Sequence, residues 1–160
     1  MTELAGPEEL LVLSIALGIV VSFFFSEVFG LAAGGVVVPG YVALFLDRPV
    51  AVAMTLTVAL TTYGLVSVLS QFVIVYGRRR TSLMILVAFA LGTALARFPD
   101  LPDALRHGDG VVIGFIIPGL IAIWFDRQGV ISTVASLSIG AVFVRLLLLL
   151  FVGPLAGGLE

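Results

Sequence analysis

The sequence contains no cysteine, no lysine and a single histidine. Without cysteine, the chain forms no disulfide and no thiolate metal site. The absence of lysine excludes the usual phosphate-binding loop, and one histidine provides no histidine pair for zinc. No Gly-x-Ser-x-Gly motif is present, and Asp103 and Asp109, in a loop around His107, do not form a plausible catalytic pair. We therefore expect no catalytic residue, no metal site and no cofactor in this chain.

Charged residues are also scarce. They make up 11% of the 160 residues, whereas 61% are hydrophobic and the mean hydropathy is +1.26. This composition lies far outside that of soluble globular domains and predicts an integral membrane protein. No soluble segment of domain size remains, so we expect a single membrane domain over residues 1–160 and no nucleic-acid partner. The N-terminus is acidic, unlike that of a signal peptide, so the apolar run from Leu10 is expected to be retained.

One stretch of the chain occurs twice. The segment Gly35–Arg48 contains Pro39-Gly40 and ends in Asp-Arg, and 79 residues later Gly114–Arg127 repeats this pattern around Pro118-Gly119 without a gap. Glycine, proline, alanine, aspartate and arginine fall at matching positions, and the remaining residues are apolar in both copies. We interpret this as an internal duplication, with halves at residues 10–76 and 82–152.

Each half is predicted to be span, broken segment, span. The uncharged runs are residues 10–25, 31–46 and 50–76 in the first half, and 82–96, 110–125 and 129 onward in the second. The middle run of each half carries the Gly and Pro residues that weaken a helix. We therefore expect an all-α integral membrane protein with about six helical segments.

The broken segments are the first candidates for a functional pathway. Their freed backbone groups cannot face lipid, so these segments should pack in the protein interior or line a hydrated cavity. Paired broken segments in two halves are typical of binding or transport sites near the bilayer midplane. The candidate pathway residues here are Pro39, Gly40, Tyr41, Pro118 and Gly119.

Charged residues near the ends of the apolar runs are further pathway candidates. Asp47-Arg48 and Asp126-Arg127 occupy equivalent positions and could be interfacial anchors or a charged rim. Arg145 lies within an apolar run, where it could snorkel to the interface, pair with Glu27, or face a partner or polyanion.

The arginine distribution predicts the orientation in the membrane. The cluster Arg78-Arg79-Arg80 should face the cytoplasm. If the broken segments cross the membrane, the halves are inverted, with four arginines inside and three outside. If those segments are re-entrant, the halves are parallel, with three inside and four outside. The count favours inverted halves by one residue.

Three motifs resemble a known family. They are Val-Val-Pro39-Gly40-Tyr41, Tyr76-Gly77-Arg78-Arg79-Arg80, and Ile-Ile-Pro118-Gly119-Leu120-Ile121-Ala122 followed by Gln128-Gly129. In order and spacing these are similar to the CapC/PgsC family, the small membrane subunit of bacterial poly-γ-glutamate synthase. The resemblance extends from about Ser14 to Val152. The acidic N-terminal lead, the tail, Arg145 and the doubled Asp-Arg depart from the family pattern.

The resemblance implies a non-catalytic, multi-pass subunit of the cytoplasmic (inner) membrane. Its expected partners are an ATP-dependent amide ligase similar to PgsB/CapB and an accessory subunit similar to PgsA/CapA. The subunit would help pass the anionic polyglutamate chain outward, and Arg78 to Arg80 are candidates for facing the ligase. We also expect a homo-oligomer. Two alternatives stay open: a stand-alone transporter or channel for an anionic solute, and a structural anchor for the ligase.

The orientation can be tested by labelling, because the chain has no native thiol. We expect a cysteine at Thr81 to react with an impermeant reagent from the cytoplasmic side and one at Asp103 to react from the outside. Labelling of both variants from the same side would contradict the predicted topology.

Overall fold

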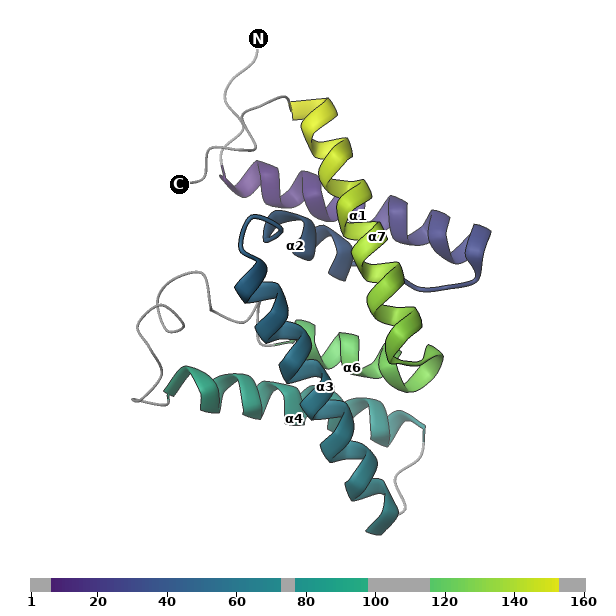
Figure 1. Ribbon diagram of the computed structural model, residues 1–160, viewed down its shortest axis with the longest axis vertical. Helices are drawn as coiled ribbons and strands as arrows, with labels where there is room; N and C mark the ends of the chain where they lie inside the picture. Colours follow the sequence, from purple (N-terminus) through teal and green to yellow (C-terminus); the bar gives the residue numbers. More distant parts are fainter. Residues whose placement is uncertain (1–6, 73–76, 98–115, 153–160) are drawn as a thin grey trace. The chain divides into compact units, whose positions relative to one another are not determined.

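The computed structural model describes residues 7–72, 77–97 and 116–152, and their regular secondary structure is entirely helical (Figure 1). The helices are α1 (Pro7–Phe29), α2 (Val38–Leu44), α3 (Pro49–Phe72), α4 (Arg78–Arg97), α6 (Ile117–Gln128) and α7 (Val130–Val152). The prediction of an all-α chain with about six helical segments is confirmed for the described residues.

Glycine and proline set the helix boundaries. Helix α1 ends before Gly30, which has a φ of 63° and donates its N–H to the Ser26 carbonyl. Proline stands in the first turn of both α2 and α6, where its missing N–H costs no helical hydrogen bond. Gly129, with a φ of 89°, separates α6 from α7. Glycine adopts this positive φ without strain, whereas a residue with a side chain would not, so the chain can turn here.

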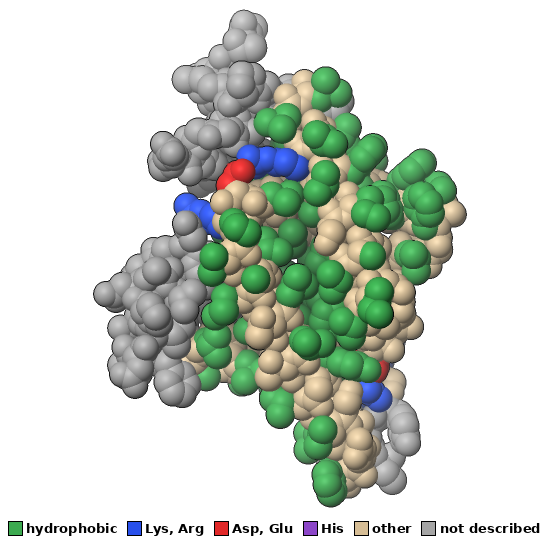
Figure 2. Space-filling view, viewed as in Figure 1, with side chains coloured by type: hydrophobic (Ala, Val, Ile, Leu, Met, Phe, Trp, Pro, Cys, Tyr) green, Lys and Arg blue, Asp and Glu red, His purple; other side chains and the backbone are tan. Residues whose placement is uncertain are grey.

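Three of the described helices are long and apolar enough to cross a membrane. These stretches are Leu11–Phe29, Pro49–Phe72 and Val130–Leu150. Hydrophobic side chains are spread widely over the visible surface, and charged ones occur at few places (Figure 2). Helix α4 is not among the three, because it carries arginines at both ends and its uncharged centre is short. The structure therefore indicates membrane association, while the number of crossings stays a prediction.

The helices group into two compact units that differ from the sequence halves. One unit comprises residues 1–47 and 134–160, with α1, α2 and most of α7. The other comprises residues 48–133, with α3, α4 and α6. Each unit thus combines the first two helices of one sequence half with the last helix of the other half.

Each unit has its own apolar core. In the α1–α2–α7 unit, the core residues come from all three helices and are Val21, Ala43, Val144 and Leu148. In the α3–α4–α6 unit they are Val66, Met84 and Ile123. Buried Phe125 also meets Tyr63 edge to face, with ring centroids 6.3 Å apart. Apolar packing of this kind fixes how the short helices α2 and α6 lie against their longer neighbours.

Serine hydroxyls satisfy backbone carbonyls in and before α2. Ser14 of α1 donates to the Gly40 carbonyl at 2.7 Å, and Ser22 donates to the Gly35 carbonyl at 3.1 Å. Ser136 of α7 donates to the Ala32 carbonyl at 3.0 Å. These bonds provide the internal partners that the broken segment needs in an apolar environment.

Glycines allow both short helices to approach their neighbours closely. A Cβ on Gly40 would lie 2.6 Å from the Ser14 carbonyl oxygen, and one on Gly119 would lie 3.0 Å from the Ile85 Cα and 3.4 Å from the Met84 oxygen. The partner residues on α1 and α4 are therefore consecutive in each case: Ser14 and Ile15, and Met84 and Ile85. In each unit a glycine of the short helix thus meets the backbone of the preceding long helix, while the duplication itself stays a prediction. Whether the halves are inverted stays a prediction.

This packing generates a stability prediction. Gly40→Ala should destabilise the chain by about 1–3 kcal/mol, because the new methyl meets α1 backbone and cannot be accommodated by a rotamer change. Gly64→Ala is the matched control, since a Cβ there meets nothing within 4 Å and alanine favours helix. Unfolding in mixed detergent micelles would measure both variants, and equal stability would contradict the close contact.

Candidate functional site: two aspartate–arginine pairs and a basic cavity

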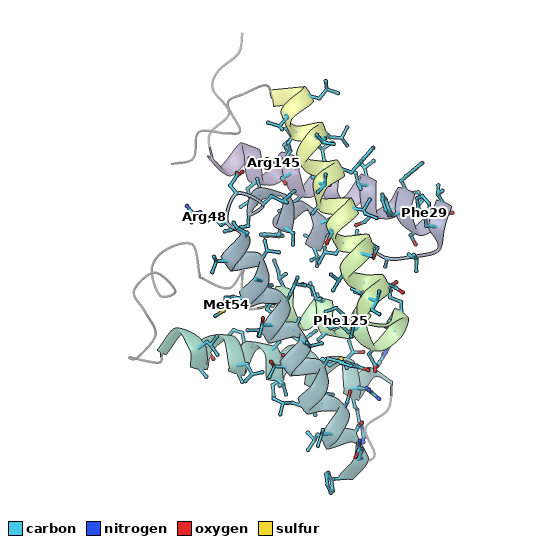
Figure 3. All side chains as sticks on the ribbon, viewed as in Figure 1. Phe29, Arg48, Met54, Phe125 and Arg145 are labelled. Atoms are coloured by element: carbon cyan, nitrogen blue, oxygen red, sulfur yellow. The ribbon has the colours of Figure 1, made fainter. Side chains whose placement is uncertain are left out.

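The first ion pair joins α7 to the end of the first broken segment. Nη2 of Arg145 donates to Oδ2 of Asp47 at 2.6 Å. The Arg145 side chain, which projects from α7 in Figure 3, is 15% exposed, whereas that of Asp47 is 64% exposed. Of the alternatives that the sequence left for Arg145, the structure favours pairing, with Asp47 as the partner in place of Glu27. A paired guanidinium explains how an apolar helix accommodates this charge.

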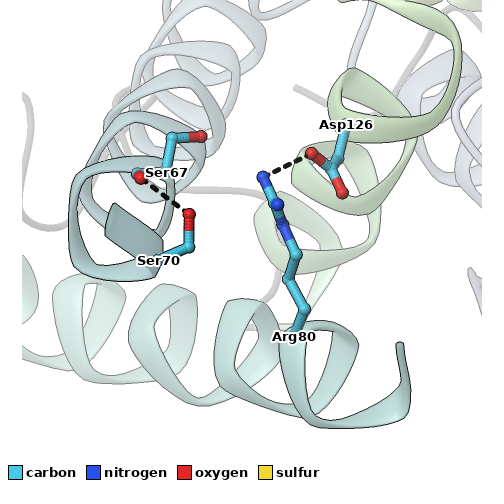
Figure 4. Close-up of polar contacts among 4 residues, drawn as sticks. All are labelled: Ser67, Ser70, Arg80 and Asp126. Carbon is cyan, nitrogen blue, oxygen red and sulfur yellow. Dashed lines mark hydrogen bonds and ion pairs between the residues drawn. The ribbon is translucent and has the colours of Figure 1, made fainter. Parts of the chain in front are cut away.

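The second ion pair joins α4 to the end of α6. Nη2 of Arg80 donates to Oδ1 of Asp126 at 2.6 Å, and the two side chains are 24% and 28% exposed (Figure 4). Arg80 lies in the first turn of α4, where the helix dipole is positive, so the acid from α6 offsets an unfavourable position for a cation.

The aspartates of the two ion pairs stand at equivalent positions of the repeated sequence, whereas their arginines do not. Asp47 and Asp126 are equivalent in the repeat, since they lie 79 residues apart. Their arginines come from α7 in one unit and from α4 in the other. Each broken segment therefore ends in a carboxylate that accepts from a guanidinium on a neighbouring helix.

A cavity of about 370 Å³ lies beside the second pair, within the α3–α4–α6 unit. Its lining residues are Gly77, Arg78, Arg80, Thr81, Met84, Ile123, Asp126 and Arg127. Three arginines and one aspartate give the described lining a net charge of +2. Met84 and Ile123 provide an apolar wall. Such a volume and mixture of groups fall within the range of small-ligand sites, which is about 300–1,000 Å³.

The predicted pathway residues of the two broken segments lie outside the described cavity lining. Pro39, Gly40, Pro118 and Gly119 are buried, as expected for interior segments, and Tyr41 is half-buried. They pack against neighbouring helices and are not part of the described cavity lining. Whether they serve a pathway stays a prediction.

Several charged candidates lie at or near the cavity. Asp126 and Arg127 line it together with Arg78 and Arg80, and the Arg127 guanidinium lies 5.3 Å from the centroid of the Trp124 ring. Arg79 is exposed and lines a shallow depression on the adjoining surface of α4. Arg48 is exposed at the start of the unit and is not part of the cavity lining.

Sequence reasoning did not place the remaining cavity residues, Gly77, Thr81, Met84 and Ile123, in a site. Thr81 and Met84 follow the arginine cluster at helical spacing, so an amphipathic reading of the start of α4 could have found them. The cavity provides one carboxylate, and the residues that the structure describes hold no cluster of three or more possible metal-ligating side chains.

These features define a class of protein: a small helical protein, with three helices suited to span a membrane and a basic cavity at a helix end. Comparison with known proteins specifies the family. The profile of the family described as "Capsule biosynthesis CapC" matches residues 17–134. The chain belongs to this family, which confirms the resemblance seen in the sequence.

Curated relatives support the assignment. The chain is 38% identical over 128 residues to "PGA biosynthesis protein CapC" of Bacillus subtilis (strain 168), an alignment that covers 79% of this chain and 85% of the relative. It is 35% identical, over the same shares, to "Capsule biosynthesis protein CapC" of Bacillus anthracis. No solved structure matches the chain.

The Arg145–Asp47 pair can be tested by a double-mutant cycle. Arg145→Gln, Asp47→Asn and the double variant should show a coupling of about 0.5–1 kcal/mol in detergent unfolding. Either single substitution already breaks the ion pair, so the second substitution costs less in the double variant. The control cycle combines Arg145→Gln with Glu27→Gln, which should be additive. Coupling to Glu27 in place of Asp47 would refute the observed pairing.

Proposed function

We propose that this chain is the membrane subunit of a poly-γ-glutamate synthase and export complex. In this proposal it partners an ATP-dependent amide ligase and an accessory subunit, and it helps pass the anionic polymer across the cytoplasmic membrane. The observation that carries the proposal is the similarity, over most of both chains, to a protein named for PGA biosynthesis.

The charges of the chain suit a polyanion. Every basic side chain is an arginine, apart from His107, and arginine keeps its charge and can bind a carboxylate through two parallel hydrogen bonds. The cavity beside Arg80 adds a place where such charges gather next to an apolar wall. A γ-linked glutamate chain carries one free carboxylate and a short methylene stem in each unit, so both features have a counterpart in it.

The arginine cluster has a second proposed role. The ligase uses ATP and so works in the cytoplasm, where we predict that Arg78, Arg79 and Arg80 lie. These residues are candidates for receiving the ligase or its product. We also propose that the chain forms a homo-oligomer, since a path for a polymer needs more wall than a few short helices readily supply.

A genetic test distinguishes this function from its alternatives. In a host whose polymer production depends on the synthase genes, deletion of this chain alone should abolish released and surface polymer, and the intact chain should restore it. Ligase recovered from detergent extracts should co-purify with the chain. Full polymer output without the chain would contradict the proposal. Transport of a small anion by the chain, with no ligase co-purified, would instead favour a stand-alone transporter.

A further inference from the structure

We propose that the basic cavity at the start of α4 is a binding site for the carboxylates of a γ-glutamyl chain, with Asp126 as its internal counter-ion. The site is defined by Arg78, Arg80 and Arg127, which line the cavity together with one aspartate, and Arg80 donates to that aspartate. This inference rests on the proposed function for the identity of the ligand. The presence of an anion site rests on the geometry alone.

The charges of the cavity are poorly balanced. Arg78 and Arg80 lie in the first turn of α4, whose N-terminal dipole is itself positive, and no acidic residue is present in that turn. Arg127 in the last turn of α6 adds a third guanidinium, and Asp126 is the one carboxylate of the described lining. Like charges that line one cavity repel one another, so an anion that enters the cavity lowers the electrostatic energy.

The contact of Arg80 with Asp126 uses little of the guanidinium. One hydrogen bond joins Nη2 to Oδ1, and the buried Nε has no hydrogen-bond partner among the described residues. An arginine has five N–H donors, and a bidentate carboxylate engages two of them in parallel. The bond to Asp126 engages one of these five donors, so the terminal nitrogens of Arg80 retain capacity for a second carboxylate. The dashed line between Arg80 and Asp126 in Figure 4 marks this contact.

The mixture of polar and apolar residues in the cavity lining favours a glutamyl unit over a bare anion. Thr81 lies on the next position of α4 and offers a hydroxyl, and the buried side chains of Met84 and Ile123 form the apolar part of the lining. A γ-glutamyl unit presents a carboxylate beside two methylene groups. The arginines would bind the carboxylate while the methylenes contact the apolar wall, and inorganic phosphate offers only the charge.

The test uses the full chain in nanodiscs of neutral phosphatidylcholine and a fluorescent γ-linked glutamyl hexamer. We expect wild-type protein to bind the hexamer more tightly than free glutamate or inorganic phosphate, with weaker binding at high salt. Arg80→Gln should weaken binding by about tenfold or more, because it removes a charge-assisted hydrogen bond. Arg97→Gln, at the opposite end of α4, removes the same charge and should leave binding unchanged.

Asp126→Asn separates a ligand site from a merely structural ion pair. The variant removes the competing carboxylate and should tighten hexamer binding by about threefold, whereas a structural pair would make it behave like Arg80→Gln. Helix content and elution volume would establish that each variant is folded. If Arg80→Gln fails this check, Arg127→Gln takes its place.

Three results would overturn the inference: no binding by wild-type protein, equal binding of hexamer and phosphate, or weaker binding by Asp126→Asn. Equal binding of phosphate would identify a general site for phosphate, such as that of a lipid headgroup. These outcomes are independent of the deletion experiment, which tests the function. Loss of polymer on deletion together with no hexamer binding would reject the site and retain the function.

Discussion

Internal satisfaction of backbone groups is the constraint on which this structure depends. A chain in hydrocarbon has no water to hydrogen-bond a carbonyl that a helix leaves unpaired. The segment before and within α2 meets this requirement with three hydroxyls, from Ser14, Ser22 and Ser136, which come from the helices on either side of it in the unit. The short helix can therefore lie in the interior of its unit without a hydrated channel around its backbone.

The close glycine contacts are the second part of the same solution. Gly18 and Gly40 meet so closely that a Cβ on Gly18 would lie 2.6 Å from the Gly40 nitrogen. At this separation the Ser14 hydroxyl reaches the Gly40 carbonyl, so packing and hydrogen bonding depend on one another. Gly119 makes the corresponding approach to α4. In both units, therefore, a glycine allows the short helix to approach the backbone of a long helix.

Sequence patterns predicted the positions of the helices better than they predicted which helices pack together. Proline, glycine and the lengths of the apolar runs indicated where the long helices begin and end, and the described boundaries of α1, α3, α4 and α7 agree within a few residues. The run that begins at residue 31 was less accurate, because α2 covers only Val38–Leu44 of it. The patterns did not indicate that Asp47 would bind Arg145, which lies 98 residues away, or that each unit would take its third helix from the other half. In a soluble protein, apolar residues that recur every three to four positions mark the buried face of a helix. Here both faces are apolar, so that signal is weak, and small and hydroxyl residues identify the contacts instead.

The two units differ in charge, and that difference is functionally informative. An aspartate stands at the end of each broken segment, but Asp47 accepts from Arg145 within the apolar helix α7, whereas Asp126 accepts from one of three arginines at the start of α4. Only the second position combines its pair with additional arginines in a cavity lining, among the residues that the structure describes. The unequal placement of arginine around the two aspartates is therefore the reason why the carboxylate-binding site is proposed beside Asp126 and not beside Asp47.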